Sequence, residues 1–142
     1  MNTNTLTASD YPFWCEEKLR NADTDQQGHI NNAVMASFFE AGRMEVFGHP
    51  GLETLRAHCM FVVVRVVIDY KRELFYPGVV RVGSRVTEIG RTSFKFDHTL
   101  RSGEVEVAHG EATCVLLDAT SRKPTPVPDD VRALLLNPAG TR

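Results

Sequence analysis

The alternation of apolar and polar residues along the chain predicts one buried helix. Apolar residues recur at helical spacing from about Ala33 to Phe47, and the polar residues of this stretch cover only a narrow sector. A helix that is apolar around most of its circumference is buried on most sides. Asn31 and Asn32 precede the helix, and the run His49-Pro50-Gly51 ends it.

Strands joined by short turns account for most of the remaining chain. The predicted elements are a strand at Phe13–Arg20, a short helix at Leu52–Ala57, four strands at Met60–Tyr70, Val79–Ile89, Ser93–Arg101 and Val105–Leu117, and a last helix at Pro128–Leu136. Successive strands with short turns must pair antiparallel. The pattern therefore predicts an α+β fold, in which a curved antiparallel sheet of about five strands wraps around one long helix.

The valine-rich stretch from Met60 to Tyr70 is apolar on both of its faces. Strict alternation divides its side chains into one face with Val62, Val64, Val66, Ile68 and Tyr70, and another with Phe61, Val63 and Val67. A strand that is apolar on both faces is typically covered on both sides. We therefore expect this stretch to be a central strand of the sheet.

Length and composition indicate one soluble globular domain that spans residues 1–142, with residues 1–10 expected to be flexible. Hydrophobic residues make up 42% of the chain and charged residues 24%, a balance that argues against disorder. The net charge is −2 and the basic residues form no stripe, which argues against nucleic-acid binding. The longest apolar stretch, Met60 to Val64, is too short to span a membrane.

The cysteines and the N-terminus indicate a cytoplasmic protein. Cys15, Cys59 and Cys114 are widely spaced and form no CxxC pair, a pattern that suits reduced thiols and gives no sign of a zinc site. The first ten residues have neither the basic nor the apolar region of a signal peptide. The chain also contains no N-x-[ST] glycosylation sequon.

The candidate chemistry lies in the segment 20–32, directly before the buried helix. Asp23 and Asp25 precede a helix N-terminus, where unpaired N–H groups and the helix dipole favour negative charge. A thioester attacked by water or by a carboxylate develops an oxyanion, and a backbone amide aimed at it contributes roughly 3–4 kcal/mol. The segment thus fits an acyl-hydrolysis site that needs neither a metal nor an organic cofactor.

Other interpretations of the same residues also fit the sequence. Asp and Asn before a helix are often only caps and turn formers. The run from Asp23 to Gly28 imitates the start of an EF-hand loop, but Val34 stands where that loop needs a glutamate. His29 fits a structural role, because no second metal-ligating residue lies near it in sequence. We therefore expect no metal site.

The segment before the helix reads Asp23-Thr24-Asp25-Gln26-Gln27-Gly28-His29-Ile30-Asn31-Asn32, and the helix itself contains Phe38-Phe39-Glu40-Ala41-Gly42-Arg43. Together they resemble the D-x-D-x-x-G-H-x-N-N…(Y/F)-F-E-x-x-R signature. This signature belongs to hotdog-fold acyl-CoA thioesterases of the 4-hydroxybenzoyl-CoA thioesterase-like group. Softer likenesses follow at Asp69-Tyr70, Gly90-Arg91-Thr92-Ser93, Ala108–Ala112 and Arg122-Lys123-Pro124, so the resemblance covers about residues 14 to 136. The chain departs from common family members at Met35, often aromatic, and at Val79, often acidic.

The resemblance implies roles for individual residues. It implies that Asp25 is the nucleophile or general base and that the oxyanion-binding amide lies near Asn32, with His29 and Asn31 as further catalytic candidates. The candidates for contacts with the substrate or for ordering its loop are Asp23, Gly28, Glu40, Arg91 and Arg72, with Lys71 beside the last. For each basic residue, an ordinary solvated charge fits equally well.

The leading prediction is an enzyme that hydrolyses acyl-CoA, without a cofactor, as a homodimer or homotetramer. Antiparallel pairing of exposed sheet edges across a two-fold axis would join the subunits and place the site between them. The alternative is a hotdog domain that binds acyl-CoA or an acylated carrier protein without turnover, although such a binder has no need of Asp25. A hotdog hydratase resembles the chain in fold only, since its His-and-acid arrangement is not found here.

Overall fold

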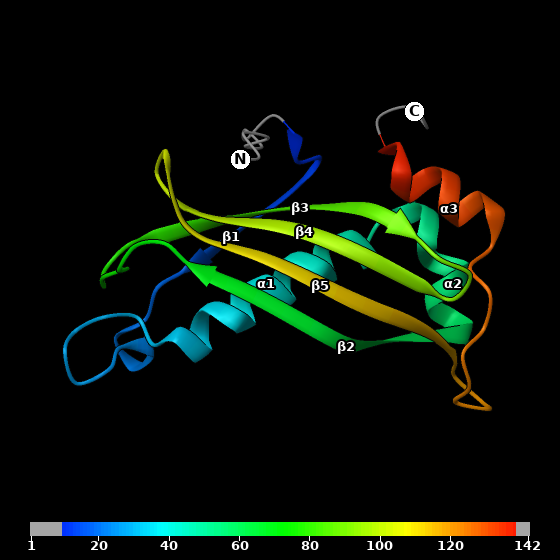
Figure 1. Cartoon of the computed structure of the whole chain (residues 1–142), viewed down its shortest axis with the longest axis horizontal. Helices are drawn as coiled ribbons and strands as arrows, with labels where there is room; N and C mark the ends of the chain where they lie inside the picture. Colours follow the sequence, from blue (N-terminus) through cyan, green and yellow to red (C-terminus); the bar gives the residue numbers. More distant parts are fainter. Residues whose placement is uncertain (1–9, 139–142) are drawn as a thin grey trace.

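The computed structural model describes residues 10–138, in which one sheet lies against one long helix (Figure 1). The strands are β1 (Phe13–Lys18), β2 (Cys59–Tyr70), β3 (Val79–Ile89), β4 (Ser93–Ser102) and β5 (Val105–Asp118). The helices are α1 (Asn32–Phe47), α2 (Glu53–His58) and α3 (Asp129–Leu136), with 3-10 turns at Asn21–Asp23 and Pro50–Leu52. The expected flexibility of residues 1–10 concerns residues that lie almost entirely outside this range.

The five strands form a single antiparallel sheet in the order β1-β3-β4-β5-β2. This confirms the α+β fold and the antiparallel sheet around a long helix. The predicted bounds agree closely with the observed ones, although the first strand ends at Lys18 and Arg20 already flanks the following 3-10 turn.

The prediction that Met60–Tyr70 is a central strand is wrong, because β2 lies at the edge of the sheet and, among the strands of residues 10–138, pairs only with β5. Three of its valines are exposed: Val63, Val64 and Val66 are 45%, 60% and 43% exposed. Apolar residues on both faces of a strand therefore do not by themselves distinguish a central strand from an edge strand.

The predicted faces of this strand are also wrong, because a bulge between Val63 and Arg65 shifts the pairing with β5. Phe61 stacks on Phe47 of α1, and the Tyr70 hydroxyl donates to the Asn32 carbonyl oxygen of the same helix. Strict alternation would place Phe61 and Tyr70 on opposite faces. The extra residue in the strand brings both to the helix side.

The core lies between α1 and the sheet, in two clusters at the two ends of the helix. From β4, Phe94, Phe96, His98 and Leu100 are all buried. Gly42 sets how closely α1 approaches the sheet: a Cβ there would lie 2.5 Å from the Ser84 Oγ. The close approach is therefore possible only with glycine at this position.

Candidate active site

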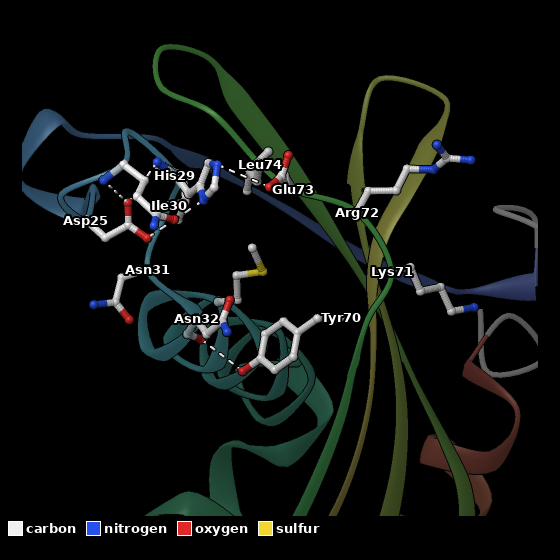
Figure 2. A pocket seen from close by; sticks show the side chains of 12 residues that line it. Asp25, His29, Ile30, Asn31, Asn32, Tyr70, Lys71, Arg72, Glu73 and Leu74 are labelled. Atoms are coloured by element: carbon white, nitrogen blue, oxygen red, sulfur yellow. Dashed lines mark hydrogen bonds and ion pairs between the residues drawn. The ribbon is translucent and has the colours of Figure 1, made fainter.

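A loop of residues 20–31 carries the candidate site and is held in place by backbone hydrogen bonds. The Ile30 N–H donates to the Leu74 carbonyl at 2.7 Å, and the Asn31 N–H donates to the Asp23 carbonyl at 2.9 Å. Gly28, at φ +82°, makes the turn that returns the chain toward the helix. The segment that follows β2 therefore forms the second wall beside this loop (Figure 2).

The two carboxylate oxygens of Asp25 have different surroundings. Its Oδ1 accepts hydrogen bonds from the backbone N–H groups of Gln27 at 2.8 Å and His29 at 3.0 Å, an arrangement that orders the loop. Its Oδ2 accepts no hydrogen bond among the described residues and lies 3.9 Å from the His29 Nδ1. One oxygen therefore fixes the side chain and the other is free for chemistry.

The N-terminus of α1 offers one backbone donor to the same site. The Asn31 side chain caps the helix, accepting from the Ala33 N–H at 2.8 Å, and the Asn31 carbonyl accepts from Val34 and Met35. Within residues 10–138, the Asn32 N–H donates to no acceptor. A free amide at a helix N-terminus is suited to bind a developing negative charge.

These groups line a cavity of about 500 Å³ between the loop, the start of α1 and the end of β2. Its lining residues are Asp25, Gln27, His29, Ile30, Asn31, Asn32, Met35, Tyr70, Lys71, Arg72, Glu73 and Leu74. Polar residues surround Asp25, whereas Ile30, Met35 and Leu74 supply an apolar wall. The cavity therefore combines a carboxylate, a free amide and room for an apolar group.

Asp23, by contrast, is a structural residue of the loop. Its carboxylate is 2% exposed and accepts from the Arg20 guanidinium at 2.8 Å and from the Arg20 backbone N–H at 3.0 Å. The hydrogen bonds from Arg20 hold the pKa of this carboxyl below its usual range. Asp23 does not line the cavity, and its backbone carbonyl fixes Asn31.

Among the remaining predicted residues, the structure brings Arg72 to the cavity but not Glu40 or Arg91. Arg72 lines the mouth, and Figure 2 shows its side chain and that of Lys71 pointing away from Asp25. Lys71 already pairs with Glu106 at 2.8 Å. Glu40 is exposed on α1, and Arg91 lies at the β3–β4 turn, at the opposite end of β3 from the loop.

Tyr70 and Glu73 are among the cavity residues that were not proposed from the sequence. Tyr70 donates from its hydroxyl to the Asn32 carbonyl at 3.1 Å and so ties β2 to the first turn of α1. Glu73 places its Oε1 3.2 Å from the His29 Nε2. Both residues lie far from the loop in sequence, and nothing in the residues around them indicates this contact.

The part of the chain that the structure describes contains neither a metal-binding cluster nor a membrane-spanning helix. Among these residues, no group of three or more His, Cys, Asp or Glu side chains is arranged to hold a metal ion. Of the helices between residues 10 and 138, none has the length and apolar character needed to cross a membrane.

Comparison with known proteins identifies the family. The family described as the thioesterase-like superfamily matches residues 19–135. A predicted thioesterase from Bacillus stearothermophilus is 33% identical, with a TM-score of 0.77 over 87% of this chain and 92% of its own. A thioesterase from Thermus thermophilus, solved with coenzyme A and zinc, is 31% identical, with a TM-score of 0.76 over 87% and 96%. No curated protein matches. These similarities confirm the resemblance and the hotdog fold expected from the sequence.

Proposed function

Because the chain belongs to the thioesterase-like superfamily, we propose that it hydrolyses acyl-CoA thioesters to a free acid and coenzyme A. The observation that carries this proposal is the pair formed by the free Oδ2 of Asp25 and the free N–H of Asn32 on one cavity. A carboxylate beside an unpaired helix amide meets the two needs of acyl transfer, a nucleophile or base and a site for the oxyanion.

Asp25 can act by two routes, and both use Oδ2. In the nucleophilic route, Oδ2 attacks the thioester carbonyl, the C–S bond breaks, the CoA thiolate leaves, and water then hydrolyses the mixed anhydride. In the general-base route, Oδ2 takes a proton from a water molecule, whose oxygen attacks the carbonyl before the C–S bond breaks. The hydrogen bonds to Oδ1 hold the carboxylate in position for either route.

The Asn32 N–H receives the negative charge that develops on the carbonyl oxygen. The helix dipole of α1 adds to this attraction, since the partial positive charge of a helix lies at its N-terminus. Asn31 acts through its cap, which aligns the first turn of α1, and His29 lies beside the reacting oxygen of Asp25. Gly28 and Asp23 order the loop, whereas Glu40 lies outside the cavity and has no part in the proposed chemistry.

The thiol part of the substrate is coenzyme A, bound at the mouth of the cavity near Arg72. The coenzyme A found in the similar structure from Thermus thermophilus supports this part of the proposal. Arg72 is exposed and points away from Asp25, as expected of a side chain that meets a phosphate rather than the thioester. Arg91 is too far along the sheet to meet the same molecule within one chain, so its role depends on a second subunit.

The working unit is at least a homodimer, formed by antiparallel pairing of two β2 strands. The edge position of β2 and its exposed valines support this assembly, because an unpaired apolar edge invites pairing with another chain. Pairing across a two-fold axis gives a closed interface. Tyr70, Lys71 and Arg72 at the end of β2 then bring the cavity close to that interface.

A hydrolysis panel tests the proposed function directly. Short, medium, long-chain and aromatic acyl-CoAs are incubated with the protein, and free thiol is followed with a chromogenic reagent. Turnover of at least one class, lost in an Asp25 variant, supports the enzyme. Saturable binding of an acyl-CoA without any thiol release would instead favour the non-catalytic binding domain and refute the proposal.

A further inference from the structure

The hydroxyl of Tyr70 joins the end of β2 to the first residue of α1 (Figure 2). It donates a hydrogen bond to the Asn32 carbonyl oxygen at 3.1 Å. The Tyr70 side chain is 45% exposed and, like Asn32, lines the cavity that holds Asp25. The hydrogen bond therefore joins two walls of the same cavity, one from the sheet and one from the helix terminus.

Tyr70 is itself held firmly by the neighbouring strand. It pairs with Ala108 of β5, which is fully buried. The backbone N–H groups of the next two residues, Lys71 and Arg72, both donate to the Val107 carbonyl, at 2.9 and 3.1 Å. A tyrosine side chain also has only two rotatable bonds before its ring. The hydroxyl therefore donates from a fixed point of the sheet.

The Asn32 carbonyl oxygen can accept this bond without giving up the helix. In an α-helix, a carbonyl oxygen accepts from the N–H four residues further on, which uses one of its two lone pairs. The second lone pair is free for the Tyr70 hydroxyl. The first turn of a helix frays easily, because its N–H groups have no partner inside the helix. The hydrogen bond from Tyr70 therefore restrains the residue where fraying begins.

Asn32 also carries the backbone donor of the candidate site. Its N–H donates to no acceptor among residues 10–138, and the last tie before it is the hydrogen bond from the Ile30 N–H to the Leu74 carbonyl at 2.7 Å. An oxyanion donor is effective when it is in place before the charge develops, since no reorganisation is then needed during the reaction. A contact that holds Asn32 therefore bears on catalysis as well as on folding.

We propose that Tyr70 is a positioning residue: its hydroxyl holds the first residue of α1 so that the Asn32 N–H stays directed at the thioester oxygen. The inference rests on the proposed function, in which this N–H binds the oxyanion. It gives the last residue of the edge strand a part in the reaction, in addition to the proposed part of β2 in subunit pairing.

The test removes a single oxygen atom. Tyr70→Phe keeps the ring that lines the cavity and deletes the hydroxyl. Tyr76→Phe is the matched control, because Tyr76 is 44% exposed and does not line this cavity. Each protein is assayed for kcat and KM on the best acyl-CoA, well below its unfolding midpoint. Nitrogen-15 NMR of asparagine-labelled protein follows the Asn32 amide, which is identified by its disappearance in Asn32→Gln.

We expect Tyr70→Phe to lower kcat by about threefold to tenfold, the worth of one neutral hydrogen bond expressed as a rate. KM should stay within about twofold of the wild type, because only an interaction of the transition state is weakened. The Asn32 amide resonance should move, and the unfolding midpoint should fall by no more than about 4 °C. Tyr76→Phe should match the wild type in all four measurements.

Tyr70→Phe with the kcat of Tyr76→Phe would overturn the proposal at any unfolding midpoint, because the hydrogen bond would then be only structural. A raised KM with an unchanged kcat would overturn it too, since the hydroxyl would then be a substrate contact. An Asn32 resonance that stays in place has the same consequence. A wild type without turnover on any thioester, combined with the expected movement of the Asn32 resonance, would refute the proposed function and leave the hold of Tyr70 on the helix terminus standing.

Discussion

Replacing Asp25 by asparagine removes the reacting oxygen and keeps the loop. The Oδ1 of asparagine can still accept from the backbone N–H groups of Gln27 and His29, the two bonds that position the side chain. The amide NH₂ takes the place of Oδ2, which accepts no hydrogen bond from the described residues. Asparagine can neither attack a carbonyl nor take a proton from water, so only the chemistry is lost.

The expected loss is at least about 100-fold in kcat, the scale of losing a positioned base or nucleophile, which corresponds to about 2.7 kcal/mol in the activation free energy. The substrate contacts around the cavity are kept, so KM should change little. The unfolding midpoint of Asp25→Asn should stay within about 2 °C of wild type, because both hydrogen bonds to Oδ1 remain.

Asp25→Ala is the matched comparison, since it removes the same oxygen and both hydrogen bonds. Their loss from a half-exposed loop should cost about 1 kcal/mol, or about 2–4 °C in the unfolding midpoint. Thiol release and thermal unfolding are measured on all three proteins. Hydrolysis by Asp25→Asn near the wild-type rate would refute the catalytic assignment. A large fall in its unfolding midpoint would refute the structural part of the reasoning.

Four further predictions concern stability, metal and assembly. Asp23→Asn should lower the unfolding midpoint more than Asp25→Asn does and should lower turnover less, since it removes a buried carboxylate paired with Arg20. Folding lowers the pKa of Asp23, so the stability that this pair contributes should also be lost as the pH falls. Burial lowers the pKa of His98 to about 3, so NMR should show this ring still neutral at pH 5. Only the unfolded chain then takes up the proton below about pH 6.5, so the contribution of His98 should lower the free energy of unfolding by about 2 kcal/mol between pH 7 and pH 5, as measured by urea titration. Activity should survive prolonged EDTA treatment, and its loss with recovery on adding one divalent ion would contradict the metal-free site. Light scattering should give at least a dimeric mass and Val64→Lys should weaken the assembly; a fully active monomer would rule out a shared site.

The sequence predicted the elements of this fold well because local patterns encode them. The spacing of apolar residues gave α1 within one or two residues of its observed ends, and β3 has the predicted bounds. The candidate loop was also readable, because a carboxylate, a glycine turn and a cap directly before a buried helix are neighbours in sequence. Contacts between near neighbours are set by the local chain, whereas the choice of Asp25 as the catalytic candidate came from the family resemblance of this segment.

Other features depend on contacts between distant parts of the chain, which no local pattern encodes. The valines of β2 predicted a central strand, but the strand order places β2 at an edge. The bulge after Val63, which no pattern indicates, turns Tyr70 toward α1. The proximity of Glu73 to His29 depends on the backbone bridge between two distant segments. The distance of Arg91 from the cavity follows from the length of β3. Local sequence determined which residues could do chemistry, and the tertiary structure decided which of them meet, because side chains meet only where long-range strand pairing and helix packing bring their backbones together.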